Sequence, residues 1–226
     1  MKKVSKMDQV MKHIDTKCWE RARSPAQKDV REQEILEVAK NLLFEYPFDK
    51  ISLSVIAKGL SFTRANLYKY FQSKEDIYLA LLADEIFQFA IRFQKLNEEF
   101  QGDISVDSFL NLWVPAFSAE RHLLFLLSIA GCILEKNCSD EILLRSKTTI
   151  LMTGKYLLPA LIRFFPNKEE TEYANILNIL TITANGMYSF CGLNESQKQL
   201  LLDNGMGDMI HDFATDYRKL LADYLK

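Results

Sequence analysis

The stretch that most constrains the fold runs from Ser52 to Lys74, with the sequence SLSVIAKGLSFTRANLYKYFQSK. Apolar residues recur in its first part at i, i+3, i+4 and i+7, which places them on one face of a short helix. They are Leu53, Ile56, Ala57 and Leu60. Ser52 precedes them at the position where a hydroxyl caps the free N–H groups of a helix. This part of the stretch therefore predicts a short helix with one buried side.

A second helix is predicted after a tight turn. Thr63 stands at its N-cap position, and the helix is expected to run from Arg64 to Phe71. Leu67 and Phe71, four residues apart, share the inward face. The outward face carries Arg64, Ala65, Asn66, Tyr68 and Lys69. Two short helices around a turn form a helix-turn-helix, a motif that inserts the exposed first turn of its second helix into the major groove of DNA.

These residues resemble the TetR family of bacterial transcription regulators. The family pattern has Ile-Ala in the first helix, Leu-Tyr-x-His/Tyr-Phe in the second, and Lys-Glu at the start of the next. This sequence has Ile56-Ala57, Leu67-Tyr68-Lys69-Tyr70-Phe71 and Lys74-Glu75 at matching spacings. The resemblance covers roughly residues 27–80, and several fixed spacings agree at once. One departure is Ser61, because the family usually has Gly in the turn.

The resemblance implies DNA contacts position by position. Arg64 and Ala65 stand where the family commonly touches base edges, and Ser52, Asn66, Tyr68 and Lys74 stand where it commonly holds phosphates. From the residues alone, Arg can pair with guanine, Asn with adenine, and Lys can neutralise a phosphate. The DNA-binding set expected here is Ser52, Thr63, Arg64, Ala65, Asn66, Tyr68, Lys69, Tyr70 and Lys74. The alternative is a solvated helix face for the basic residues and plain core packing for the aromatic ones.

Composition and charge agree with this interpretation. Only 8 Gly and 5 Pro occur in 226 residues, and 3.6-residue apolar periods run along the chain, so an all-α protein is expected. Residues 1–74 carry 15 Lys and Arg against 9 Asp and Glu, whereas residues 75–226 carry 13 against 21. A basic head and an acidic body would orient the molecule on a polyanion. Ordinary uneven surface charge is the alternative.

The chain divides into three expected parts. Residues 1–23 form a basic N-terminal extension, which is expected to be a short extra helix, a basic arm on DNA, or a frayed terminus. Residues 24–73 form a three-helix DNA-binding domain, whose first helix begins at Ser24-Pro25 and stops before Pro47. Residues 74–226 form a larger helical domain for effector binding and dimerisation.

Ser73 to Asp76 form a capping box that starts a long helix joining head and body. Further helices are expected at about 104–118, 120–136, 140–165, 169–191 and 207–225, with a short one at 195–203. Helix 169–191 is apolar on two faces and so needs partners on both sides. The resemblance implies that helices 169–191 and 207–225 pair with their copies in a homodimer. The alternative is that both complete the core of the monomer.

A site for a small apolar or aromatic effector is expected in the body. Pro115 and Pro159 interrupt helical patterns, where they can kink a helix and open space. Aromatic and soft apolar residues near them could line a cavity; these are Trp113, Phe117, His122, Phe125, Met152, Tyr156 and Tyr188. Simple core packing is the alternative for each.

Signs of other functions are weak. The sequence has no H-E-x-x-H, no G-x-S-x-G and no phosphate loop, so an enzyme is not expected and no catalytic residue is proposed. Cys18, Cys132, Cys138 and Cys191 form no C-x-x-C pair, so no metal and no cofactor are expected. The sequence lacks an apolar signal segment and a stretch able to span a bilayer, so we expect no membrane association and a cytoplasmic protein.

The function expected from the sequence is that of a TetR-type transcriptional regulator, a repressor by family habit. It would bind a pseudo-palindromic double-stranded DNA operator as a homodimer and be released by the effector. Two alternatives stay open. One is a DNA-binding protein of the same fold without a small-molecule effector. The other is a helical ligand-binding or catalytic protein that does not bind DNA.

Overall fold

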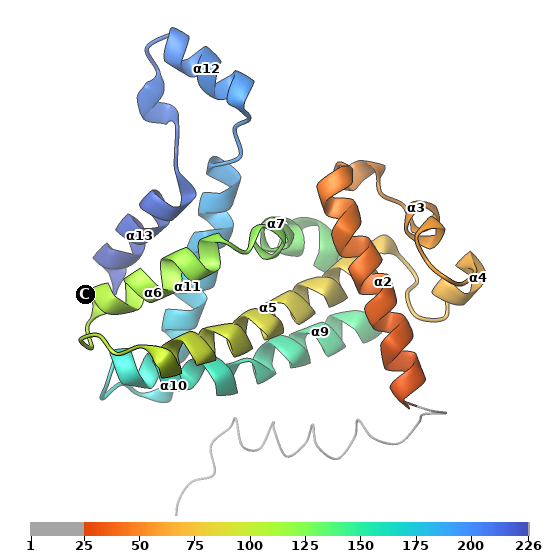
Figure 1. Ribbon diagram of the computed structural model, residues 1–226, viewed down its shortest axis with the longest axis horizontal. Coiled ribbons are helices and arrows are strands. Elements are labelled where there is room, and N and C mark those ends of the chain that lie inside the picture. The colour runs from red at the N-terminus through yellow and green to blue at the C-terminus, as the bar shows by residue number, and fades with distance from the viewer. Residues whose placement is uncertain (1–24, 226) are drawn as a thin grey trace, which may run out of the picture.

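The computed structural model describes residues 25–225, and side chains from Asp29 onward. The expected extension 1–23 lies outside the described residues. Between residues 25 and 225 the chain is helical, with no strand, as the sequence predicts. Figure 1 shows a small helical head at one end, a long helix leading from it, and a larger helical body.

The head consists of α2 (Pro25–Glu45), α3 (Leu53–Lys58) and α4 (Arg64–Leu67), with a 3₁₀ turn at Phe48–Lys50 between the first two. α2 ends just before Pro47, where the sequence places its stop. Its inner face meets the other two helices in a core of fully buried side chains: Ile35, Ala39, Ile51, Ile56, Leu67 and Phe71. The three helices therefore share one small core.

Head and body are joined by α5 (Lys74–Glu99). The expected capping box is present, because the Ser73 side chain accepts a hydrogen bond from the Asp76 N–H and the Asp76 side chain accepts one from the Ser73 N–H. The first half of α5 is buried all round, and the Tyr78 hydroxyl donates to the Ala39 carbonyl of α2 at 3.1 Å. The start of this long helix is therefore part of both domains.

The body packs α6 (Val106–Ser118), α7 (Arg121–Ile129), α9 (Asp140–Met152), α10 (Gly154–Phe164), α11 (Glu170–Phe190) and α13 (Phe213–Tyr224) around α5 and each other. An aromatic cluster fills its centre; it consists of Phe89, Phe93, Phe109, Trp113, Phe117 and Tyr217. Trp113 Nε1 donates to the Tyr217 hydroxyl at 3.0 Å, and that hydroxyl donates to the Leu180 carbonyl at 2.8 Å. The indole N–H of Trp113 and the hydroxyl of Tyr217 therefore both have hydrogen-bond partners inside an apolar core.

Three helices expected in the body differ from the structure. The stretch 120–136 is α7, a π-helical segment at Ala130–Leu134 and α8 (Glu135–Asn137). The stretch 140–165 is two helices, because a turn at Thr153 separates α9 from α10. Pro159 lies inside α10, which continues to Phe164, so the helix is interrupted at Thr153 and not at the proline.

The expected helix 207–225 begins at Phe213 instead, after a 3₁₀ turn at Gly207–Met209. The physical reason is the cap, since the Asp212 side chain accepts a hydrogen bond from the Thr215 N–H at 2.9 Å. The expected short helix is present as α12 (Glu195–Asp203). Residues 192–211, called the arm below, stand away from the body above α11 and α13 (Figure 1).

Within residues 25–225, the length and apolarity required for a bilayer crossing are not combined in any one helix, although two sharply bent helix pairs reach them jointly.

Candidate nucleic-acid interface

The turn between α3 and α4 is fastened to α2 by polar contacts. The Ser61 N–H donates to Glu34 Oε1 at 2.9 Å, and Arg31 donates to the Ser61 hydroxyl at 2.6 Å and to Glu34 at 2.9 Å. Hydrogen bonds from the Ser61 side chain and backbone lower the pKa of the Glu34 carboxyl below its usual value. Ser61 does not have a positive φ angle, so the turn does not require the Gly that is usual at this position.

The first helix of the motif is capped as the sequence predicts. Ser52 Oγ accepts a hydrogen bond from the Val55 N–H at 3.3 Å. The second helix is shorter than expected, because α4 ends at Leu67 and the chain continues in a turn through Tyr70. Thr63 is the N-cap residue of α4, as expected, but within the described chain its hydroxyl makes no capping hydrogen bond. The Phe71 N–H still donates to the Leu67 carbonyl at 3.1 Å, which keeps these two side chains on the inner face.

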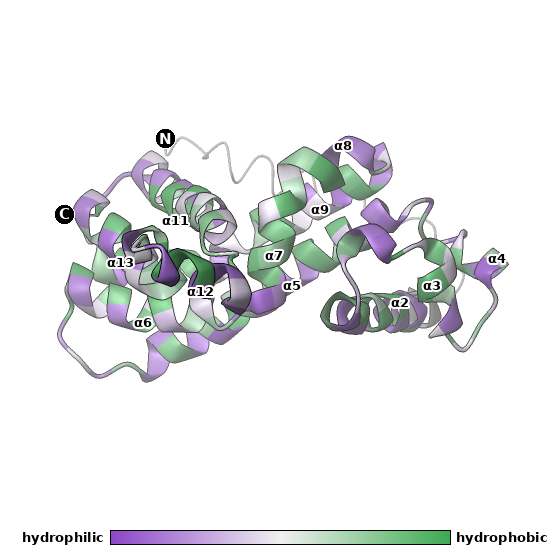
Figure 2. Cartoon of the chain, turned by 90° about the horizontal axis from the view of Figure 1, so that it is seen from above, coloured by the Kyte–Doolittle hydropathy of each residue, from purple (hydrophilic) through white to green (hydrophobic). Residues whose placement is uncertain are grey.

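The outer face of α4 and of the turn that follows it carries the expected exposed residues. Arg64, Ala65, Tyr68 and Lys69 are exposed, and Asn66 is half-buried, whereas Leu67 and Phe71 on the inner face are buried. Arg64 donates to the Tyr68 hydroxyl at 2.8 Å, with its guanidinium 5.4 Å from the centre of the Tyr68 ring. α4 lies at the far tip of the head, where hydrophilic residues predominate (Figure 2). This face combines positive charge with aromatic surface.

Tyr70 and Lys74 are less free than the residues on α4. Tyr70 is half-buried, and its ring centre lies 6.3 Å from that of Phe62. Lys74 Nζ donates to the Phe48 carbonyl at 2.8 Å and lies 4.3 Å from the centre of the Phe48 ring. One of the three N–H donors of the Lys74 ammonium is thus used within the protein.

A junction between head and body is the feature that the sequence did not reveal. Asp76 is fully buried, and its carboxylate accepts hydrogen bonds from the N–H groups of Gln72 at 2.8 Å, Ser73 at 3.3 Å and Ser139 at 2.6 Å. The capping box signals the bond to Ser73. No local pattern signals Ser139, which is 63 residues away at the start of α9.

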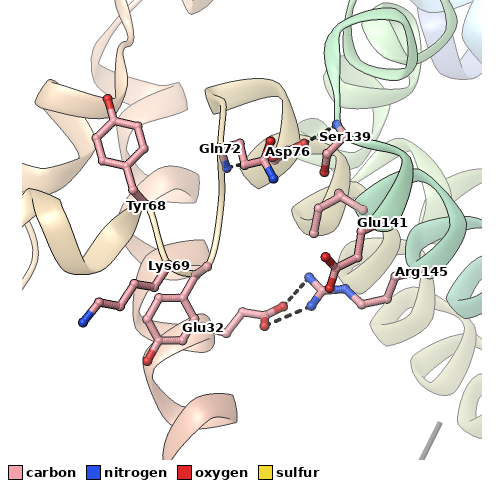
Figure 3. Close-up of a pocket in the computed structure, with 10 residues that line it drawn as sticks. Glu32, Tyr68, Lys69, Gln72, Asp76, Ser139, Glu141 and Arg145 are labelled. Atoms are coloured by element: carbon pink, nitrogen blue, oxygen red, sulfur yellow. Dashed lines mark hydrogen bonds and ion pairs between the residues drawn. The ribbon is translucent and has the colours of Figure 1, made fainter. Parts of the chain in front are cut away.

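A second contact crosses the same junction. Arg145 of α9 donates two hydrogen bonds to the Glu32 carboxylate of α2, from Nη1 to Oε2 at 3.1 Å and from Nη2 to Oε1 at 2.5 Å. Its guanidinium also lies over the Phe71 ring. Glu32 and Arg145 border a polar hollow. Tyr68, Lys69 and Gln72 also line it (Figure 3). In that view Lys69 points away from the body. The segment that follows α4 is thus held directly against the body.

The seven residues expected near an effector lie in different places. Trp113 and Phe117 are buried in the aromatic cluster. Tyr156 packs edge-on against Phe87, and Tyr188 against Phe213. Phe125 lies 6.2 Å from Phe48 between ring centres, at the base of the head, and Met152 is half-buried at the end of α9. None of them borders the hollow at the junction.

His122 occupies a notable position at the start of α7. Its ring centre lies 3.8 Å from that of Phe44, the last large side chain of α2. Burial, reinforced by the nearby Lys40 charge, lowers the pKa of His122 below its usual value. Its Nε2 and the nearby Ser118 hydroxyl are buried with no hydrogen-bond partner among the described residues. The corner between α6 and α7 therefore holds two buried polar atoms that lack partners among the described residues.

The described residues show no cluster of three or more His, Cys, Asp or Glu side chains placed to hold a metal ion. Burial raises the pKa values of the Cys138 and Cys191 thiols, which keeps both in the less reactive protonated form.

Comparisons with known proteins follow the division into head and body. Residues 35–81 match the profile described as bacterial regulatory proteins, tetR family, and residues 84–226 match that of the tetracyclin repressor-like C-terminal domain. The HTH-type transcriptional regulator EthR of Mycobacterium tuberculosis is 41% identical over 70 residues, which are 31% of this chain and 32% of EthR. An HTH-type transcriptional regulator of Staphylococcus aureus is 29% identical over 74 residues, 33% of this chain and 40% of that protein.

The alignments thus span between a third and two fifths of the length of these curated relatives. Among solved structures, the fatty acid degradation regulator FadR of Bacillus halodurans shares the fold, with a TM-score of 0.52 and 17% identity over 89% of this chain and 96% of FadR. The profile of the C-terminal domain alone matches more than half of the chain, and the profile of the DNA-binding domain matches the head. The chain belongs to the TetR family of bacterial regulatory proteins.

Proposed function

We propose that this regulator is a homodimeric repressor that binds a pseudo-palindromic DNA duplex, with one α4 segment in the major groove of each half-site. The observation that carries the proposal is the two-sided structure of this segment. Leu67 and Phe71 fix its inner face in the core of the head, while Arg64 and Lys69 are exposed on the outer face. A rigid, basic helix face suits both base-edge contacts and phosphate contacts.

The surface proposed for dimerisation lies on α11 and α13. The buried side of α11 packs in the body through Tyr173, Ile176, Leu180 and Ala184. The other apolar side of α11 is exposed to solvent, and Ile182 and Phe190 are each 70% exposed. On α13, Leu220 and Tyr224 are exposed as well. Exposed apolar faces on two adjacent helices support a four-helix contact with a second copy.

Release by a small apolar or aromatic effector would act through the junction between head and body. α9 contacts α5 along its length and binds the head through Ser139 and Arg145. A ligand that shifted α9 or α5 would therefore displace the head directly and lower the affinity for DNA by linkage. The proposal implies a cytoplasmic location, because bacterial operators lie in the cytoplasm.

Selection from random duplex DNA with the purified full chain, at two salt concentrations, tests the proposal. We expect enrichment of an inverted repeat and an affinity that falls as salt rises, because phosphate contacts release counterions. Absence of an enriched sequence at both salts would contradict DNA binding and favour a ligand-binding or catalytic protein. An enriched site with no effector response in a ligand screen would favour a DNA-binding protein without a small-molecule effector.

Arg64→Ala is expected to lower affinity for the selected site by about 1–3 kcal/mol and to relax sequence preference, because Arg reads guanine by a bidentate contact. Lys69→Ala is expected to weaken binding to all duplexes alike, because Lys contacts phosphates without reading sequence. Lys95→Ala removes an exposed lysine near the C-terminal end of α5, the end away from the head, and serves as the control. Binding of Arg64→Ala equal to that of the parent would remove Arg64 from base recognition.

A further inference from the structure

The arm is a defined structure rather than an irregular loop. Asn194 and Gln197 form a reciprocal capping box, with both hydrogen bonds at 2.9 Å. At the other end of α12, Gly205 has a φ angle of 70°, and the Met206 N–H donates to the Leu201 carbonyl at 2.8 Å. This is the hydrogen-bond pattern of a Schellman motif, for which Gly is favoured. Both ends of α12 are thus specified by the sequence.

Its own chain does not bury this helix. Within residues 25–225, no residue from Asn185 to Asp216 is buried. A nine-residue helix is marginal in water without tertiary packing, so its stability should come from a contact. The arm also bears large apolar side chains that are between 49% and 63% exposed; they are Leu200, Leu202, Met206 and Met209. Figure 2 shows hydrophobic residues, in green, in α12.

The base of the arm lies on the proposed dimer surface. The ring of Phe190, at the end of α11, lies 6.3 Å from that of His211, and Tyr188 lies 6.2 Å from Phe213 at the start of α13. These ring contacts hold the two ends of the arm together. Phe190 itself is 70% exposed, so apolar surface continues from α11 towards the arm.

The apolar areas indicate what the arm adds. A large apolar side chain has an accessible surface of roughly 200 Å² when it is fully exposed. On this basis the exposed apolar residues of α11 and α13 together present about 1,000 Å² of accessible surface over two protomers, which is near the lower bound for a biological interface. The arms nearly double this to about 1,900 Å², within the range of stable specific interfaces. The charge of the arm argues against DNA as the partner, because Glu195, Asp203 and Asp208 outnumber Lys198 and would repel phosphates.

We propose that the arm crosses to the second protomer and packs its apolar side chains on that copy, as part of the dimer interface. This inference rests on the proposed homodimer and names a further segment that holds it. The arm would then gain its stability from dimerisation. Two protomers would exchange equivalent contacts across the two-fold axis, so that the contact of the arm occurs twice in the symmetric assembly.

Hydrogen–deuterium exchange of the full chain, measured above and below the dimer dissociation constant, tests the inference. Amides of residues 195–203 are expected to be protected in the dimer and to exchange about tenfold or more faster in the monomer, because an isolated short helix opens readily. Exchange that is slow at every concentration would assign the covering contact to the same chain. Protection that appears only when DNA is added would assign it to DNA. Either result would overturn the inference.

Matched variants separate the arm from the rest of the interface. Leu200→Glu is expected to weaken dimerisation about tenfold or more in sedimentation equilibrium, because it places a charge in an apolar contact. Leu144→Glu, at a position on α9 that is 71% exposed, is the control and should leave dimerisation unchanged. If Ile182→Glu dissociates the dimer and Leu200→Glu does not, the arm inference fails while the proposed dimer stands. A parent protein that is monomeric throughout would contradict the proposed dimer itself.

Discussion

Asp76 illustrates how much one buried carboxylate can organise. It is fully buried, and its carboxylate is stabilised by three backbone N–H groups from two segments of the chain. Hydrogen bonds to a charged acceptor are stronger than neutral ones, and they satisfy donors that would otherwise be buried and unpaired. Asp76 therefore caps α5 and also fixes the start of α9 to it.

Replacing Asp76 by Ala should lower the free energy of unfolding by about 3 kcal/mol, because it leaves buried N–H groups without acceptors. Glu75→Ala is the control, since it removes a carboxylate from the same turn without removing those bonds, and should cost less than about 0.5 kcal/mol. Urea unfolding at one fixed protein concentration measures both, since dimerisation makes stability depend on concentration. Equal losses would show that Asp76 acts only through its charge at the helix N-terminus.

The elements of the head are held together by close approach as well as by apolar packing. A Cβ atom on Gly59, at the end of α3, would lie 2.7 Å from Cγ1 of Val38 on α2. The φ angle of Gly59 is −86°, so the Gly is needed for space and not for a left-handed conformation. The turn that follows is fastened to α2 by Glu34 and Arg31. α4 thus derives its position from two neighbours, although it is only four residues long.

Gly59→Ala is expected to destabilise the head by about 1–3 kcal/mol, because an added methyl group overpacks the contact between α3 and α2. Gly154→Ala, at the start of α10, is a matched control, since nothing among the described residues lies within 4 Å of the added Cβ. Thermal unfolding should show partial recovery in the Gly59→Ala, Val38→Ala double variant, where the clashing side chain is shortened. No recovery in the double variant would place the strain elsewhere.

In the whole molecule, the head is attached to the body by the continuous helix α5 and by polar contacts from α9. The contact between Glu32 and Arg145 joins residues 113 positions apart, and it stands beside the segment that follows α4. The Arg145 side chain is 41% exposed and that of Glu32 is 18% exposed, so water screens part of their attraction. Such a contact can define an orientation while contributing little to stability.

A double-mutant cycle with Glu32→Gln and Arg145→Met should give a coupling energy of about 0.5–1 kcal/mol in the free energy of unfolding, as for other partly exposed ion pairs. The coupling should shrink at high salt, where exposed charges are screened. A cycle with Lys168 and Glu172, an exposed pair within the body, gives the reference for a contact that joins no domains. Zero coupling at low salt would show that the orientation of the head does not depend on this pair.

Local patterns in the sequence determined most of the elements and the identity of the motif. Helical periodicity, the caps at Ser52 and Ser73 and the stop at Pro47 depend on neighbours within a few residues, so they are readable from the chain. The inward positions of Leu67 and Phe71 and the exposure of Arg64 and Lys69 follow from the same periodicity. The candidate DNA-binding face was therefore largely predictable.

Tertiary structure decided what depends on groups far apart in the chain. The length of α4, the bond from Ser139 to Asp76 and the pairing of Arg145 with Glu32 arise where separate segments meet, and no local pattern encodes such meetings. Tertiary packing also decided which large apolar side chains are buried. Trp113 lies in the core, whereas Ile182, Phe190 and the arm remain exposed. The sequence specifies which side chains are apolar, but only the packing of the whole chain decides which of them are left for a partner.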